Sequence, residues 1–252
     1  MADLSDKALD KIEANIDEVL NTVNAKITRL IAQLKTTKDG RLAKMELARM
    51  RSTRKAIIKE LSAFREVVDD ATNYAGVTVA VKARMKKIAF SFTQSDHALV
   101  KFLSDSAYNE LSSVVDNYAL KISNAVIKGS ITGTPISDIE IEVAQLLKGG
   151  TTKSGRSLAS YAKTFTNTEY MEVDRALTLK AAENIGSDKF RYSGSLIKDS
   201  RPFCQERAGK VYTKEEIEAW RDKSWAGKKE GDPFVVLGGY NCRHFLVPVI
   251  EG

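Results

Sequence analysis

The side chains best suited to chemistry lie near the C-terminus, at Cys204 and in the run Cys242-Arg243-His244. A structural zinc site usually has four cysteine or histidine ligands in closely spaced pairs. Cys204 has no Cys-x-x-Cys neighbour, and the other histidine, His97, lies far away in the chain. Cys204, Cys242 and His244 are therefore weak candidates for metal ligands, and we predict no metal site and no cofactor.

A nucleophile or a disulfide is the other chemistry open to these residues. On a strand, Cys242 and His244 share one face, but a catalytic dyad also needs a group that orients the histidine, and none is identified. A Cys204–Cys242 disulfide requires that the fold bring the two residues together in an oxidising compartment. Two buried thiols acting as small apolar side chains are the favoured interpretation. We predict that the chain is not an enzyme.

Positive charge is concentrated in one segment. The chain carries 39 basic and 33 acidic side chains, a formal charge of +6, and residues 35–65 hold ten basic against three acidic ones. A solvated helix face, an acidic partner protein and DNA phosphates each explain such a segment. Its one aromatic residue, Phe64, lies on an apolar stripe, so DNA would be bound without sequence preference. The residues predicted to make this contact are Lys44, Arg49, Arg51, Arg54, Lys55 and Lys59.

Hydrophobic periodicity predicts a long helical hairpin at the N-terminus. A turn at Thr36–Gly40 follows a first helix, and a second apolar stripe runs from Met50 to Ala71. Two long helices joined by a short turn indicate an antiparallel hairpin. The first helix has one apolar face, in which residues recur at alternating steps of three and four: Leu9, Ile12, Ile16, Val19, Val23, Ile27, Leu30 and Leu34.

Further helices are predicted over residues 77–92, 99–128 and 137–148, with a restart of the chain at Thr93–Asp96. We expect Gly129 and Gly133 to break the helical run, and a capping box at Ser137–Glu140 to start the next helix. No apolar run is long enough to span a bilayer, so no membrane partner is expected. The first residues lack the basic flank and apolar core of a secretory signal.

The composition changes after residue 148. Residues 149–155 are rich in glycine, serine and threonine, which is typical of a linker. A helix at 157–185, ended by Gly186, leads into a module with short apolar runs. The module is predicted to contain a strand at 190–197, a helix at 214–220 entered through Thr213-x-x-Glu216, and strands at 234–237 and 245–249.

These elements predict an α+β fold in which helices and strands are segregated along the chain. We expect a helical domain with a long antiparallel hairpin at 1–148, a linker at 149–156 and a small mixed α/β C-terminal module at 157–252.

The C-terminal module carries a distinctive combination of short motifs, which ends in Asn-Cys-Arg and a closing Val-Pro. In this combination it resembles the C-terminal domain of the phage Mu F-like head morphogenesis family, the minor head proteins of tailed bacteriophages, over roughly residues 157–250. Many family members carry Cys-x-x-Cys and Cys-Arg-Cys, whereas this chain has Arg207 and His244 where the last cysteine of each would stand. The matching positions are Asp199, Arg201, Cys204, Gly209, Lys210, Asn241, Cys242, Arg243 and Pro248.

The resemblance implies a minor structural protein of a tailed-phage virion, assembled in the host cytoplasm and acting in head morphogenesis at the portal or neck, or inside the head. Its partners would be portal or other capsid and neck proteins, with several copies in each virion. The motif residues are expected to shape the module, with Asp199, Arg201 and Arg243 in one lattice of ion pairs and hydrogen bonds.

Two alternatives stay open. One is an internal protein of the particle that binds nucleic acid during packaging or ejection, with the basic segment as its binding surface. The other is a thiol- or zinc-dependent hydrolase at Cys204, Cys242 and His244.

Overall fold

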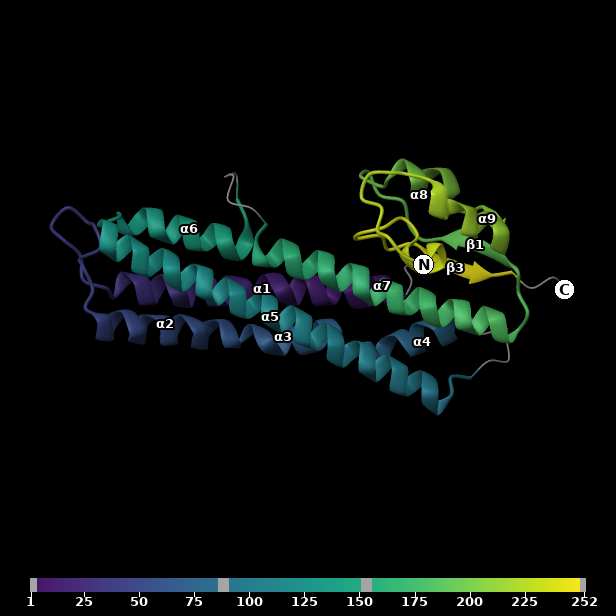
Figure 1. Ribbon diagram of the computed structural model, residues 1–252, viewed down its shortest axis with the longest axis horizontal. Coiled ribbons are helices and arrows are strands. Elements are labelled where there is room, and N and C mark those ends of the chain that lie inside the picture. The colour runs from purple at the N-terminus through teal and green to yellow at the C-terminus, as the bar shows by residue number, and fades with distance from the viewer. Residues whose placement is uncertain (1–3, 86–90, 151–155, 250–252) are drawn as a thin grey trace. The chain divides into compact units, whose positions relative to one another are not determined.

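In a computed structural model, residues 4–85, 91–150 and 156–249 are described, and within them long helices precede a small antiparallel sheet (Figure 1). The predicted α+β class is confirmed. None of the helices in these ranges combines the length and the apolar character that a membrane span requires.

The chain divides into two compact units, each built from segments distant in sequence. The sheet unit comprises Met1–Lys11, Thr72–Ala107 and Thr164–Gly252, and the helical unit comprises Ile12–Ala71 and Tyr108–Lys163. This division does not follow the sequential domains 1–148 and 157–252. The reason is that three long helices each contribute to both units: α1 (Leu4–Ala32), α5 (Gln94–Thr132) and α7 (Leu158–Asn184).

The helical unit contains the predicted hairpin. Lys26 Nζ lies 3.4 Å from Glu60 Oε2, and Asn15 Nδ2 donates to Asp70 Oδ2 at 3.3 Å, so earlier residues of the first arm meet later residues of the second. The second arm consists of two helices, α2 (Leu47–Ser62) and α3 (Phe64–Thr72). The hairpin therefore forms as an antiparallel pair, but with a break at Ala63.

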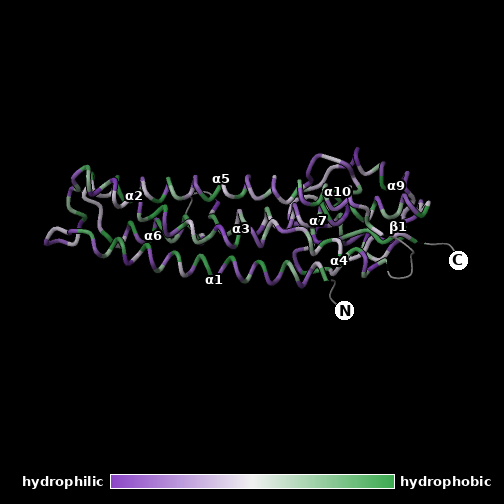
Figure 2. Tube along the Cα trace, turned by 90° about the horizontal axis from the view of Figure 1, so that it is seen from below, coloured by the Kyte–Doolittle hydropathy of each residue, from purple (hydrophilic) through white to green (hydrophobic). Residues whose placement is uncertain are grey.

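The apolar face of α1 differs slightly from the predicted one. Ile12, Val19 and Leu30 are only partly buried. A straight α-helix has 3.6 residues per turn. Its buried face therefore shifts gradually relative to a strict seven-residue repeat and includes Leu20 and Ile31. Figure 2 shows hydrophilic and hydrophobic residues alternating along this helix. The buried residues of this apolar face are Leu9, Ile16, Leu20, Val23, Ile27 and Ile31, and Leu34 is buried just beyond the end of α1.

Two predictions at the junction of α5 and α6 (Ile136–Lys148) are wrong. Gly129 lies inside α5, where a Cβ atom would come within 2.4 Å of Ile139 Cδ1, so this glycine allows close helix packing. Ser137 is already helical, and the N-cap is Pro135, with no side-chain cap. Gly133, at φ +64°, follows the end of α5 as expected.

In the sheet unit, α4 (Ala75–Arg84) covers the start of the helix predicted at 77–92, and residues 86–90 of that prediction lie outside the described ranges. The restart at Thr93–Asp96 is confirmed as a reciprocal cap. Thr93 N donates to Asp96 Oδ2 at 2.7 Å, and Asp96 N donates to Thr93 Oγ1 at 3.3 Å. This pair satisfies backbone donors at the start of α5.

The sheet has the order β2-β1-β3, and both pairings are antiparallel. Its strands are β1 (Lys189–Ser193), β2 (Val211–Thr213) and β3 (Phe245–Pro248). Short helices lie between them: α8 (Pro202–Arg207), α9 (Lys214–Glu218), the 3-10 helix η1 (Ala219–Asp222) and α10 (Pro233–Val236). The core of this region contains Phe190, Tyr192, Phe203, Trp220, Phe234 and Leu246.

Sequence patterns predicted this region only in part. The capping box of Thr213 and Glu216 and the strand at the C-terminal end are confirmed. The strand predicted at 234–237 is wrong, because Asp232 accepts from Phe234 N at 2.9 Å and Pro233 occupies the first turn of a short helix. A four-residue apolar run does not by itself distinguish a strand from a buried helical turn. Neither α8 nor β2 was predicted, and residues 151–155 of the predicted linker lie outside the described ranges.

Candidate functional site

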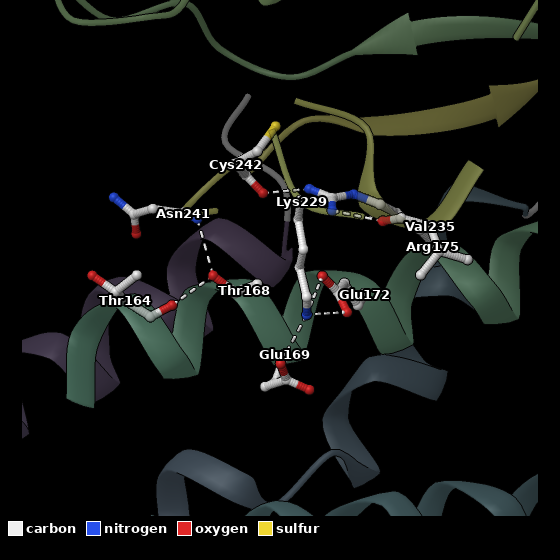
Figure 3. Close-up of polar contacts among 9 residues, drawn as sticks. All are labelled: Thr164, Thr168, Glu169, Glu172, Arg175, Lys229, Val235, Asn241 and Cys242. Atoms are coloured by element: carbon white, nitrogen blue, oxygen red, sulfur yellow. Dashed lines mark hydrogen bonds and ion pairs between the residues drawn. The ribbon is translucent and has the colours of Figure 1, made fainter. Parts of the chain in front are cut away.

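One arginine of α7 organises the loop that carries the Asn-Cys-Arg motif. Arg175 is 2 % exposed. Its Nε donates to His244 O at 2.8 Å. Its Nη1 donates to Val235 O at 2.8 Å and its Nη2 to Cys242 O, as Figure 3 shows. The planar guanidinium thus satisfies three carbonyl groups that precede or begin β3. Arg175 was not identified from the sequence. Its position as an arginine on the buried face of the helix predicted at 157–185 was the signal that could have found it.

Two further residues of α7 hold the turn at Asn241. Its φ of 60° lies in the left-handed region, which asparagine tolerates better than most residues. Asn167 Nδ2 donates to Asn241 Oδ1 at 2.7 Å, and Asn241 N donates to Thr168 Oγ1 at 3.0 Å. Two side chains of α7 therefore hold Asn241 in this turn.

A lysine attaches the preceding loop to the same helix. Lys229 Nζ lies 3.2 Å from Glu169 Oε1 and 2.8 Å from a carboxylate oxygen of Glu172 (Figure 3). Burial raises the pKa of Glu172, against the opposing effect of the lysine. Burial also opposes the charge of Lys229, but its contacts with Glu172 and Glu169 raise its pKa overall. The partly buried ion pairs fix the loop before α10.

Cys204, Cys242 and His244 come together in the space between α8 and the loop before β3. The two Sγ atoms lie 4.0 Å apart, and Cys242 Sγ lies 3.6 Å from His244 Nδ1. All three ligand atoms lie within 4.8 Å of one another, and all three residues are buried. Both cysteines are free thiols. The weak metal candidates of the sequence are therefore neighbours in space.

Tyr192 of β1 completes this cluster. Its hydroxyl donates to Cys204 Sγ at 3.3 Å and lies 4.0 Å from Cys242 Sγ, and its ring lies against the His244 ring with centroids 5.2 Å apart. A Cβ atom on Gly238 would come within 2.6 Å of Cys204 Sγ and 2.8 Å of Cys242 Sγ. The sequence did not single out Tyr192 or Gly238 for contact with the thiols.

The two thiols titrate as a coupled pair. The hydrogen bond from Cys204 lowers the pKa of Cys242 against the effect of burial, and Arg175 adds to the lowering. The same sulfur–sulfur contact, together with burial, raises the pKa of Cys204. The sulfur–sulfur contact therefore shifts the two pKa values in opposite directions.

The predicted lattice among Asp199, Arg201 and Arg243 does not form. Arg201 donates to Ala226 O at 2.9 Å and to Tyr240 O at 2.6 Å, and Arg243 pairs with Asp10. Asp199 is exposed. Arginine side chains have several donors, and the carbonyl groups of the glycine-rich loop stand nearer to Arg201 than any carboxylate that the sequence suggested.

The other motif positions act through the backbone. Gly209 has a φ of +81°, and its N–H donates to Tyr192 O at 2.8 Å. Lys210 is exposed, and its carbonyl oxygen accepts from Tyr192 N at 2.9 Å. Pro248 pairs with Phe190 at the end of β3. These positions shape the turns and the sheet beside the cluster.

The basic residues predicted as a contact surface lie on and just before α2, and we call them the basic face: Lys44, Arg49, Arg51, Arg54, Lys55 and Lys59. All six are exposed. Arg54 donates to Asn124 Oδ1 at 2.7 Å. Across the described ranges, none of the six forms an ion pair with a carboxylate. Most of this positive charge is therefore not neutralised within the unit.

A buried carboxylate elsewhere in the sheet unit leads to a pH prediction. Asp96 is 1 % exposed, and its pKa is lowered from its ordinary value of 3.8 to about 2, mainly by its hydrogen bond with Lys180 and then by Thr93. Because the folded pKa is depressed, this group stabilises the fold at pH values above about 3.8. That contribution is lost as the pH falls through about 2.

We expect the wild-type free energy of unfolding to decrease between about pH 5 and pH 2, and the decrease to be shallower in Asp96→Asn. Urea titrations at several pH values measure both slopes. Asp105→Asn is the control, because that carboxylate is exposed and pairs with Lys101 on the surface of the same helix. Equal slopes for wild type and Asp96→Asn would contradict the assigned role of Asp96.

A separate pocket of about 400 Å³ lies beside Trp220, Trp225 and Leu237. Neither cysteine lines it, nor does His244. The thiols are packed in the core, at 2 % and 3 % exposure, and do not line this pocket.

Comparisons of the chain with protein-family models, with curated proteins and with solved structures find no match. The site is therefore interpreted from its own geometry. It is a buried cluster of two thiols, an imidazole and a phenol, held in place by Arg175 and by the turn at Asn241.

Proposed function

We propose that the protein is a non-enzymatic structural component of a tailed-phage virion that acts in head morphogenesis at the portal or neck, or inside the head. The proposal starts from the sequence resemblance of the C-terminal module. The observation that supports it best is the use of the motif residues: Arg201, Asn241 and Cys242 are engaged in internal packing and hydrogen bonds. Residues arranged in this way maintain a shape and leave no reactive group at a surface.

Quantitative mass spectrometry of purified particles and their precursors tests this proposal. We expect the protein in mature particles, at a defined copy number per portal, together with portal, capsid or neck proteins. Presence in precursors alone would assign it an assembly role without a place in the finished virion. Absence from both would overturn the proposal.

The hydrolase alternative is disfavoured by the burial of the thiols. A cysteine nucleophile must reach its substrate, and both cysteines are almost fully buried and lie outside the pocket lining. Hydrolase assays of the wild type and of Cys242→Ser distinguish the two interpretations. Hydrolysis that is lost in a folded Cys242→Ser variant would favour the enzyme.

The second candidate function is sequence-independent contact with nucleic acid, and the exposed basic face favours it. Lys44, Arg49, Arg51, Lys55 and Lys59 have no acidic partner within the described ranges, so their charges remain available to phosphates. An acidic partner protein would use the same charges, and a binding experiment separates these two partners.

Reversing four charges of the basic face, at Arg49, Arg51, Arg54 and Lys55, is expected to weaken binding to bulk duplex DNA at least about tenfold at low salt. Wild-type affinity should decrease linearly with salt on a logarithmic scale, and the variant should have a shallower slope. Fluorescence anisotropy at several salt concentrations measures both quantities.

The matched control reverses the same number of charges on exposed residues of the sheet unit: Lys198, Lys210, Arg221 and Lys223. Both variants have the same net charge, so a loss confined to the first assigns DNA contact to the basic face. Equal losses would indicate an effect of net charge alone. Salt-insensitive binding, or none, would overturn DNA contact and leave an acidic protein as the partner.

A further inference from the structure

We propose that Cys204, Cys242 and His244 form a binding site for a thiophilic metal ion, and that Zn²⁺ is the ion it accepts. The sequence argued against a metal site because its ligands did not form closely spaced pairs. Folding brings Cys204 of α8 together with Cys242 and His244, which both lie in the loop before β3. The inference does not depend on the proposed virion role.

The spacing of the donor atoms matches the edges of a coordination tetrahedron. With zinc–sulfur bonds of about 2.3 Å and zinc–nitrogen bonds of about 2.0–2.1 Å, two sulfurs lie about 3.8 Å apart, and sulfur and nitrogen about 3.6 Å apart. The observed distances are 4.0 Å for the two Sγ atoms and 3.6 Å for Cys242 Sγ to His244 Nδ1. The third separation, between Cys204 Sγ and the His244 ring nitrogen, lies within 4.8 Å, so this pair must close by up to about 1.2 Å for all three donors to bind one ion.

The surroundings hold the ligands in this arrangement. Arg175 fixes the carbonyl groups of Cys242 and His244, and so holds the backbone of two ligands. The Tyr192 hydroxyl donates to Cys204 Sγ at 3.3 Å, and such a donor stabilises a metal-bound thiolate. Gly238 has no side chain where the two sulfurs approach it.

His244 offers one ring nitrogen to the cluster. The residue is 6 % exposed, and within the described ranges its Nε2 has no hydrogen-bond partner. The polar contact of its ring is with Cys242 Sγ through Nδ1. An ion would bind at Nδ1, the ring nitrogen that faces the sulfurs, and the ring proton would then reside on Nε2.

Charge balance also favours a divalent ion. Binding breaks two S–H bonds and forms two metal–sulfur bonds, and two protons are released to solvent. Two thiolates neutralise Zn²⁺, so the loaded site would carry no net charge in the core. The three protein ligands come from α8 and from the loop before β3, so the ion would stabilise the packing of these two segments.

The experiment is a titration of the reduced, metal-free full chain with Co²⁺, whose thiolate complexes absorb strongly in the near ultraviolet, followed by displacement with Zn²⁺. We expect one Co²⁺ per chain, a thiolate absorption band, its loss on addition of Zn²⁺, and a higher Tm with Zn²⁺. Zn²⁺ should also block alkylation of both cysteines of the wild type, a readout that needs no variant.

Variants test the assignment of each ligand. Cys204→Ser, Cys242→Ser and His244→Gln should each weaken binding by at least about 100-fold, and Tyr192→Phe by about tenfold. His97→Gln is the matched control, because His97 is exposed and distant in sequence, and it should bind as wild type does. Circular dichroism checks that each variant is folded.

Several results would overturn the site. The reduced wild type would take up no Co²⁺ or Zn²⁺, or would bind without a thiolate band. Alternatively, protein isolated without reductant would contain a Cys204–Cys242 disulfide, which shows that the thiols pair with each other. If a ligand variant does not fold, the wild-type alkylation result decides the question.

Discussion

Arg175→Met is expected to lower the free energy of unfolding by about 4 kcal/mol. The substitution removes the donors for two buried carbonyl oxygens, those of Cys242 and His244, and for the partly buried one of Val235. Each buried acceptor without a donor costs about 1–3 kcal/mol, so methionine of similar length cannot compensate by packing. Urea denaturation followed by circular dichroism measures the loss.

Arg175→Lys should recover only part of this stability. An ammonium group is a compact donor that cannot present a planar fork to three oxygens at once. Arg191→Met is the control, because Arg191 is exposed on β1, and its change should stay within about 0.5 kcal/mol. A loss below about 1 kcal/mol in Arg175→Met would contradict the central role assigned to this side chain.

Gly239→Ala is expected to lower the free energy of unfolding by about 3 kcal/mol or more. Gly239 has a φ of +89°, and a Cβ atom there would lie 2.0 Å from Gly227 O. The neighbour is backbone, which cannot rotate away, and Gly227 O also accepts from Tyr240 N at 3.0 Å. The alanine therefore adds steric overlap to the conformational cost of a positive φ.

Gly209→Ala separates these two costs. Gly209 has a similar φ of +81°, but no atom lies within 4 Å of its added Cβ. This variant should lose only about 1–2 kcal/mol, the cost of the left-handed conformation itself. Thermal and urea denaturation of both variants give the difference. Equal losses at the two positions would show that the close approach of Gly239 to Gly227 adds nothing to the loss in the free energy of unfolding.

The sequence predicted those features that depend on neighbours along the chain. The apolar spacing from Leu9 to Leu34 produced α1, and the reciprocal cap of Thr93 and Asp96 produced the start of α5. Gly186, with φ +66°, follows the end of α7 as expected. Helical periods and capping involve residues within about four positions, so their physical causes are visible in the sequence.

Local patterns failed where packing decided the outcome. Gly129 is a helix breaker by propensity, but the contact with Ile139 keeps it inside α5. The apolar run at 234–237 fits a strand or a buried turn equally well, and the Asp232 cap settles most of it as the helix α10. The first outcome depends on a contact with another helix, and the second depends on a cap. Hydrophobic periodicity reports neither of them.

By itself, the sequence determined the helical character of the chain, the mixed C-terminal module, the basic segment and the set of thiol and imidazole residues. Only the tertiary structure decided that Cys204 and Cys242, 38 residues apart, lie in contact. It also decided that Arg175 binds a carbonyl 69 residues away. The physical reason is that such contacts depend on how whole helices and strands pack against one another. The spacing of residues along the chain does not specify that packing.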